Sequence, residues 1–151
     1  LMTAFVSPNK AEERATRQEC IKKVSEVIKL IKEQGSEAAY KIMLDEDGPF
    51  VWKDAHIFSI DTETGALLAH INGAVGFQMR HYSDATGGYP YADILDLLKS
   101  KDEGWLTYIS DRMGRSTPRL KHMHYRKVPG KKIVLCSGYY PIISENQVST
   151  K

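Results

Sequence analysis

The segment over residues 50–68 constrains the fold of this chain more than any other part. Residues 50–53 and 56–60 are rich in aromatic and β-branched side chains, which are typical of strands. The acidic stretch over residues 61–65 ends in a glycine that can take the positive φ of a tight hairpin turn. Residues 66–68 then begin a returning strand. This pattern predicts an antiparallel hairpin in the middle of the sequence.

A long amphipathic helix is predicted before this hairpin, over residues 8–34. Four apolar side chains repeat at three- and four-residue spacing and so share one helix face: Ile21, Val24, Ile28 and Ile31. Ser7 can cap the helix, Pro8 suits its first turn and Gly35 can end it. A shorter helix is expected over residues 36–44. The apolar face of the long helix must pack on the sheet of its own domain, against a second copy in a homodimer, or on both in succession.

The rest of the chain is predicted to form a sheet whose strands are interrupted by one long crossover segment. Five strands are expected, near residues 54–60, 66–71, 104–110, 120–128 and 132–139. The crossover over residues 72–103 carries a glycine-rich loop and a helix over residues 91–99. Sequential hairpins predict an α+β fold, with a five-stranded antiparallel sheet and helices on one face. We expect one domain over residues 1–151, with sheet and crossover over 50–140 and a polar tail over 141–151.

The composition of the chain limits which classes of partner it is expected to bind. The net charge of +2 over 151 residues is small and does not favour nucleic acid. No apolar run reaches the roughly 18 residues that a membrane span needs. Residues 1–6 are too short, and lack the cationic lead, for a complete signal peptide. Membrane attachment is therefore expected only through segments absent from this sequence.

Sequence motifs for catalysis and for cofactors are missing. The chain has no Gly-x-Ser-x-Gly elbow, Walker loop, Rossmann glycine triplet or His-Glu-x-x-His pair. Cys20 and Cys136 lie far apart without Cys-x-x-Cys spacing, so they are two packed free thiols or a single bridge. We expect no cofactor and no catalytic site. A small enzyme with an unrecognised site remains a third alternative.

Two histidines in the expected fourth strand could take part in a metal site. His122 and His124 are two residues apart and share one face of a strand. His81 or His56 could supply a third ligand. The pattern is unspecific, and we expect no metal.

Several short motifs follow one another along most of the chain, in residues 48–54, 58–61, 65–70, 104–108, 125–130 and 137–140. Their order resembles that of single-Cache domains, which are extracytoplasmic sensors with a PAS-like fold. The sequence departs from the family in the crossover, where Gly76, Phe77, Gln78 and Met79 replace Gly-Lys-Asn-Leu. It also lacks a Trp-Pro pair after the third strand. These departures fall near the expected ligand site.

The resemblance implies a long N-terminal helix, a PAS-like sheet and a ligand cavity between sheet and crossover. It implies a small molecule as partner, a short organic acid above all, and a role in signal transduction or chemotaxis at an extracytoplasmic location. The predicted ligand-binding residues are Trp52, Arg80, His81, Tyr91, Tyr108, Lys121 and His124. Lys121 matches a strand lysine of the family and could meet a carboxylate as a point charge. Arg80 could hold a carboxylate with both arms of its guanidinium.

The other predicted residues are expected to contact the ligand because of their side-chain type or their position. Tyr91, Tyr108 and Trp52 could form walls with a polar tip. His81 lies in the crossover beside Arg80, and His124 replaces part of a Ser-Tyr pair of the family.

Each of these residues also has a purely structural alternative. Trp52 could belong to the core, and Lys121, Arg80 and His81 could lie in solvent. His70 could be a strand-end histidine with its hydrogen bonds satisfied, or it could be a group of the pocket. Two alternative functions stay open. One is a PAS- or profilin-like interaction module without a small ligand, and the other is a soluble secreted binding protein.

Overall fold

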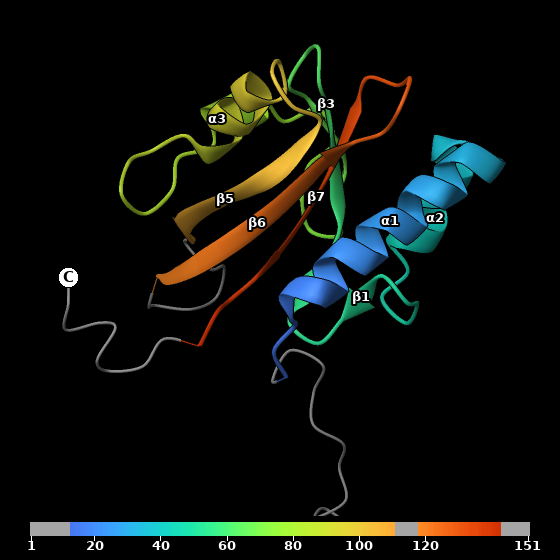
Figure 1. Ribbon diagram of the computed structural model, residues 1–151, viewed down its shortest axis with the longest axis horizontal. Helices are drawn as coiled ribbons and strands as arrows, with labels where there is room; N and C mark the ends of the chain where they lie inside the picture. The colour runs from blue at the N-terminus through green and yellow to red at the C-terminus, as the bar shows by residue number, and fades with distance from the viewer. Residues whose placement is uncertain (1–12, 111–117, 143–151) are drawn as a thin grey trace, which may run out of the picture.

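The computed structural model describes residues 13–110 and 118–142 as one antiparallel sheet with helices on both faces (Figure 1). The helices are α1 (Arg17–Gln34), α2 (Ser36–Met43), the 3-10 turn η3 (Met79–His81) and α3 (Pro90–Leu97). The strands are β1 (Val51–Trp52), β2 (Ala55–His56), β3 (Phe58–Asp61), β4 (Leu67–Ala69), β5 (Glu103–Ser110), β6 (Arg119–Lys127) and β7 (Ile133–Tyr139). Five strands form the main sheet in the order β4-β3-β7-β6-β5, all antiparallel to their neighbours, and β1 and β2 form a separate small hairpin. The expected α+β fold with a five-stranded antiparallel sheet is confirmed.

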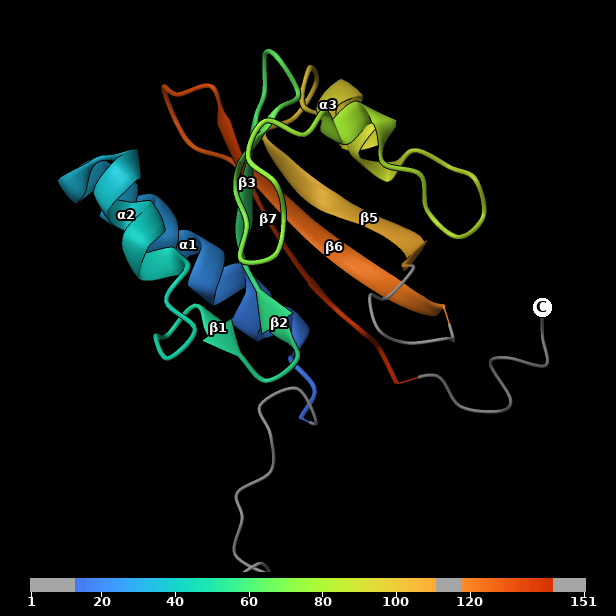
Figure 2. The ribbon, with the colours of Figure 1, turned by 180° about the vertical axis from the view of Figure 1, so that it is seen from behind.

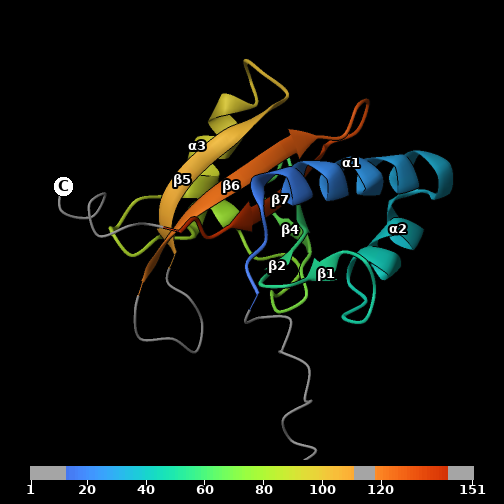
Figure 3. The same ribbon diagram turned by 60° about the horizontal axis from the view of Figure 1, so that its bottom comes forward.

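The helices occupy both faces of the sheet, whereas the sequence predicted one. Helix α1 packs along β6 and β7, with α2 beside it, while α3 and η3 lie on the opposite side (Figures 1 and 3). The alternation of side chains along β7 separates two cores. Val134 and Cys136 pack on the α3 side, and Ile133 and Leu135 pack on the α1 side. The α3 side is where the crossover lies.

Helix α1 begins at Arg17, later than the predicted range of 8–34, because Thr16 caps it. The Thr16 hydroxyl accepts from the Glu19 N–H at 3.2 Å, and the Glu19 carboxylate accepts from the Thr16 N–H at 2.9 Å. This reciprocal pair is a capping box. Ser7 and Pro8, the predicted start, lie outside the described residues. Residues 13–16 are described and are not helical.

The buried face of α1 is slightly rotated from the predicted one. It carries Cys20, Val24, Val27, Ile28 and Ile31. Ile21, assigned to the stripe by spacing, is 38% exposed. No described helix is long and apolar enough to cross a membrane.

Strand boundaries agree closely with the prediction except at the first strand. The segment 54–60 divides into β2 and β3 at Ile57, because β2 folds back on β1 while β3 joins the main sheet. The tight turn between β1 and β2 holds Lys53 at a φ of 48°, which is unusual for a residue other than glycine. Both cysteines are free and buried, in opposite cores, and their burial raises the pKa of the Cys20 thiol to about 11.

Candidate ligand cavity

A cavity of about 430 Å³ lies on the α3 side of the sheet. The segment between β4 and α3 lies over this face (Figure 2). Part of the cavity wall is apolar and comes from β3, β4 and the crossover, through Phe58, Leu67, Ala74, Phe77 and Met79. Pockets for small ligands in proteins have this range of size and this mixture of apolar wall and few polar groups.

Lys121 of β6 supplies a positive charge to the cavity. Side chains alternate along β6, so Lys121 shares its face with Met123 of the α3-side core. Its Nζ lies 5.2 Å from the centre of the Tyr140 ring, a cation–π distance. A Cβ at Gly138 would lie 2.6 Å from Lys121 Cε, so the glycine leaves the room that the lysine side chain occupies. Among the described lining residues, Lys121 and Asp54 are the charged ones.

Two histidines face each other beside this lysine. His56 of β2 and His70, just after β4, place their Nε2 atoms 3.3 Å apart. The Nδ1 atom of His70 accepts a hydrogen bond from the Asn72 N–H at 2.9 Å. Burial lowers the pKa of His56 to about 3, with a further contribution from the Lys121 charge. The same two causes lower the pKa of His70. Both rings are therefore neutral at neutral pH.

Tyrosines close the other part of the cavity. The hydroxyls of Tyr91 in α3 and Tyr108 in β5 share a hydrogen bond of 2.7 Å, and both side chains are buried. Tyr82 packs edge-on against Tyr91, with ring centres 5.4 Å apart. Burial raises the pKa of both Tyr91 and Tyr108 well above the usual value. The phenols remain protonated, so they are hydrogen-bonding walls and not anions.

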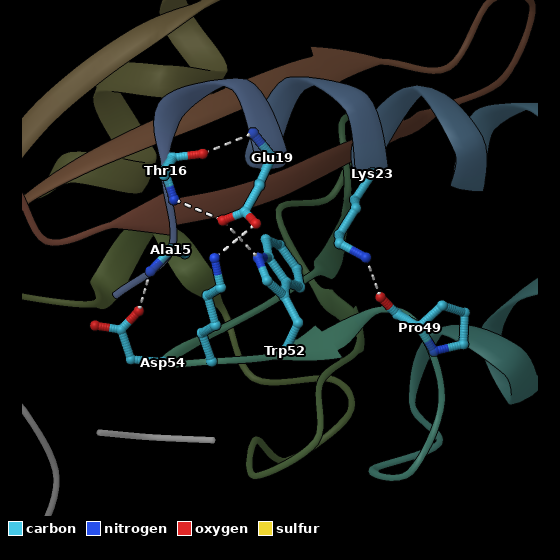
Figure 4. A network of polar contacts seen from close by, with 8 residues as sticks. Ala15, Thr16, Glu19, Lys23, Pro49, Trp52 and Asp54 are labelled. Atoms are coloured by element: carbon cyan, nitrogen blue, oxygen red, sulfur yellow. Dashed lines mark hydrogen bonds and ion pairs between the residues drawn. The ribbon is translucent and has the colours of Figure 1, made fainter. Parts of the chain in front are cut away.

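Three of the seven residues predicted to bind ligand line this cavity: Tyr91, Tyr108 and Lys121. Trp52 does not, because it belongs to the core under α1. Its indole Nε1–H donates to the Glu19 carboxylate at 3.4 Å, next to the Lys53–Glu19 ion pair at 2.8 Å (Figure 4).

The remaining three predicted residues also lie outside the cavity. Arg80 donates from Nη1 to the Thr64 carbonyl at 2.8 Å, so it ties η3 to the β3–β4 turn. His81, at the end of η3, is exposed. His124 points to the opposite face of the sheet, where its ring lies 4.9 Å from that of Trp105. The cause is strand alternation, which places His124 and Lys121 on different faces.

The histidines named as possible metal ligands lie on different faces of the sheet. His122 and His124 share the α1 face, whereas His56 lines the cavity on the other face. Within residues 13–110 and 118–142, no three His, Cys, Asp or Glu side chains come together as metal ligands.

Several polar and aromatic lining residues were not among the predicted ligand-binding residues, including Asp54, His56, Tyr82 and Tyr140. For His56 a signal existed, since two-residue spacing places it on the same side as Phe58 and Ile60. The position of Asp54 in the cavity depends on the β1–β2 hairpin. This hairpin was not predicted, because residues 54–60 were expected to form a single strand.

Comparison with known proteins gives matches of structure only. A scan against family models and a search of curated proteins found no match. Among solved structures, a periplasmic sensor domain of a chemotaxis protein superposes with a TM-score of 0.65 at 14% identity, over 83% of this chain and 92% of that one. A Cache chemosensory domain, solved to explain carboxylic acid recognition, gives 0.63 at 18% identity, over 85% of this chain and 100% of that one.

A third match is a methyl-accepting chemotaxis protein from Vibrio parahaemolyticus, with a TM-score of 0.61 at 16% identity, over 82% of this chain and 87% of that one. The three superpositions each extend over more than four-fifths of this chain and of the matched chain. The protein therefore has the fold of Cache sensor domains.

Proposed function

We propose that this protein is an extracytoplasmic sensor domain that binds a short organic acid in the cavity beneath the crossover. The observation that carries the proposal is the lysine in that cavity. Lys121 enters a space of about 430 Å³ whose other polar side chains are neutral imidazoles, phenols, Asn72, Ser110 and Asp54. A carboxylate offers Lys121 a charge-assisted hydrogen bond that the aromatic walls cannot offer.

The neutral histidines and phenols fit the same ligand class. Neutral imidazole and phenol groups donate hydrogen bonds to an anion without carrying an opposing negative charge. The apolar wall suits a short hydrocarbon tail. Tyr91, Tyr108 and Lys121 are thus the ligand contacts that we propose from the predicted set.

The comparisons support the sensor role. Two of the matched structures come from chemotaxis proteins, and the third is a chemosensory domain that recognises carboxylic acids. The proposed mechanism is a shift in population between two arrangements of the crossover, which requires the ligand to contact them unequally. No chemical step is involved, so we propose that the protein is not an enzyme.

The alternative of an interaction module without a ligand predicts a site filled by the protein's own side chains. The open cavity favours the sensor. A soluble secreted binding protein would use the same cavity, and the two differ only in what is attached to the domain.

The experiment is calorimetric titration with acetate, propionate, lactate and pyruvate, with propionamide as an uncharged control. We expect at least one acid to bind and the amide not to bind. Lys121→Ala should weaken binding at least about tenfold, or about 1.4 kcal/mol. Lys131→Ala, which removes the same charge from an exposed turn, should leave affinity unchanged. Equal affinity of Lys121→Ala and the parent protein would refute the role of Lys121.

A further inference from the structure

The hydrogen bonds around His70 assign the protons of the histidine pair. Because His70 Nδ1 accepts the Asn72 N–H, its own ring proton must lie on Nε2. That proton points to His56 Nε2 at 3.3 Å, which must therefore be the acceptor. The proton of His56 lies on Nδ1. The opposite assignment would leave His70 without any ring proton.

A third proton has no place in this arrangement. Added to His70 Nδ1, it would oppose the Asn72 N–H; added to His56 Nε2, it would oppose the N–H of His70. Protonation of either ring must break one of the two hydrogen bonds. The nearby charge of Lys121 acts in the same direction, and so does burial.

The charges that face the pair come from several elements. Lys121 on β6 is the cation, and Asp54 in the β1–β2 turn is the anion, held by the Ala15 N–H at 2.8 Å. The other titratable lining groups are phenols, from the crossover, α3, β5 and the residue after β7: Tyr82, Tyr91, Tyr108 and Tyr140. With the histidines neutral, Lys121 is the one cation among the described lining residues, while the Asp54 carboxylate, already bound by the Ala15 N–H, opposes every anion and a dianion most.

From the single lysine and the pair of histidines that has no place for a further proton, we infer that the cavity selects acids with a single negative charge, and that the His56–His70 pair sets this selectivity. The inference rests on the proposed function. A monocarboxylate pairs with Lys121, and the site carries no second positive charge for a dicarboxylate. A buried second carboxylate without a cation is costly. A dianion can enter only when it brings a proton that one histidine takes up.

The proton-linked uptake has a definite pH dependence. A bound second carboxylate would face the pair and raise the pKa of the histidine that it contacts. Dicarboxylate affinity should then rise as the pH falls, with uptake of close to one proton per bound molecule. Monocarboxylate affinity should change much less over the same range, because its single carboxylate pairs with Lys121 and leaves the histidines without a second carboxylate.

The test is calorimetry with propionate and fumarate at about pH 8, where both probes are ionised, and at about pH 5.5, where both are still mainly ionised. We expect fumarate to bind at least tenfold more weakly than propionate at the higher pH. We expect this difference in affinity between the two acids to narrow at least threefold at the lower pH. The measured heat of fumarate binding should then depend on the buffer, because protons are taken up. The double substitution of His56→Gln and His70→Gln keeps hydrogen-bonding side chains but leaves no ring that titrates, so it should remove the narrowing. His81→Gln, at an exposed histidine, is the matched control.

The outcomes separate the inference from the proposed function. If propionate binds and fumarate binds equally well at about pH 8, the charge selectivity is wrong while the sensor proposal stands. If fumarate binds weakly and lowering the pH does not help, the histidine pair is not the selector. If neither acid binds, and the wider acid panel also fails, both proposals fall.

A nitrogen-detected NMR titration of the free protein checks the proton assignment without any ligand. We expect His70 to carry its proton on Nε2, His56 to carry its proton on Nδ1, and both rings to stay neutral at about pH 5.5. An ordinary titration of both rings near about pH 6.5 would overturn the inference.

Discussion

Single side chains in the cavity depend strongly on their immediate partners. The Tyr91 and Tyr108 hydroxyls satisfy each other inside the α3-side core, and the two histidines do the same beside Lys121. Removing one member of such a pair leaves the other buried without its hydrogen bond, which usually costs more than removing both.

The tyrosine pair provides a stability test. Tyr91→Phe or Tyr108→Phe should each lower the free energy of unfolding by about 1–3 kcal/mol, because one buried hydroxyl loses its partner. The double substitution should cost less than the sum of the two. Urea denaturation measures all three, and Tyr89→Phe, at a side chain that is 52% exposed, should be neutral. Additive losses would show that the hydroxyls are not coupled.

The depressed pKa of His56 predicts a pH dependence of stability. The folded state has a pKa of about 3 and the unfolded state an ordinary value of about 6.5, so below about pH 6.5 the unfolded state binds a proton that the folded state does not. Stability is full above that pH and should be lower by about 2 kcal/mol at about pH 5. His70, His122 and His124 act in the same direction.

Urea denaturation between about pH 7.5 and pH 5 measures this slope. His56→Gln should flatten part of it, and His81→Gln should not change it. A stability that stays constant over this range would contradict the neutral assignment of the pair.

At the scale of the elements, the start of α1 holds the β1–β2 hairpin in place. One carboxylate, Glu19, caps the helix, accepts from Trp52 and pairs with Lys53 (Figure 4). The Lys23 ammonium donates to the Pro49 carbonyl at 2.6 Å on the same side of the helix. The hairpin in turn supplies Asp54 and His56 to the cavity.

Glu19→Ala should therefore lower the free energy of unfolding by about 1–2 kcal/mol, because it removes half of the capping box and two further hydrogen bonds. Chemical denaturation measures the loss. Glu26→Ala, on the exposed face of the same helix, should change stability by less than about 0.5 kcal/mol. Equal effects of the two substitutions would show that the contacts of Glu19 are not what stabilises this helix end.

Element types could be predicted from the sequence because periodicity and turn residues are local signals. The stripe of apolar residues in α1 and the acidic turn before Gly65 both gave the correct element. The helix start was placed too early because Ser7 and Pro8 read as a cap, whereas Thr16 and Glu19 also carry the capping-box spacing. The division of residues 54–60 into two strands at Ile57 could not be predicted from the sequence, because it depends on which other strand each half pairs with.

At the scale of the whole molecule, the cavity and the start of α1 share residues. Asp54 lines the cavity and accepts from the Ala15 N–H, one residue before the helix cap. Tyr140 also lines the cavity, and its carbonyl accepts from Arg14 at 3.2 Å. A ligand that moves either residue acts directly on the segment that enters the helix.

Hydrogen exchange should report this link. A saturating acid that binds in the calorimetric screen should change the exchange rate of amides near the start of α1 at least about threefold, because the Ala15 N–H depends on Asp54. Asp54→Ala should keep measurable binding and lose the ligand-dependent change at α1. A change at α1 that survives in this variant would show that the link runs through other residues.

The site was less predictable than the fold because it depends on which face each strand side chain takes. Lys121 was predicted from the resemblance, as the match to a strand lysine of the family, and Tyr91 and Tyr108 were predicted as aromatic walls with a polar tip. His124 was assigned to the cavity, but the alternation of side chains along β6 places it on the opposite face of the sheet. Arg80 was also assigned to the cavity, but its guanidinium donates a hydrogen bond to the nearby Thr64 carbonyl. His56 and Asp54 needed the separate β1–β2 hairpin.

The most direct measurement is a crystal structure of the protein grown with the acid that binds best. We expect electron density for a carboxylate in the cavity, with one oxygen within hydrogen-bond distance of Lys121 Nζ and the tail against the aromatic wall. A cavity filled by the protein's own side chains, with Lys121 turned into solvent, would contradict this expectation.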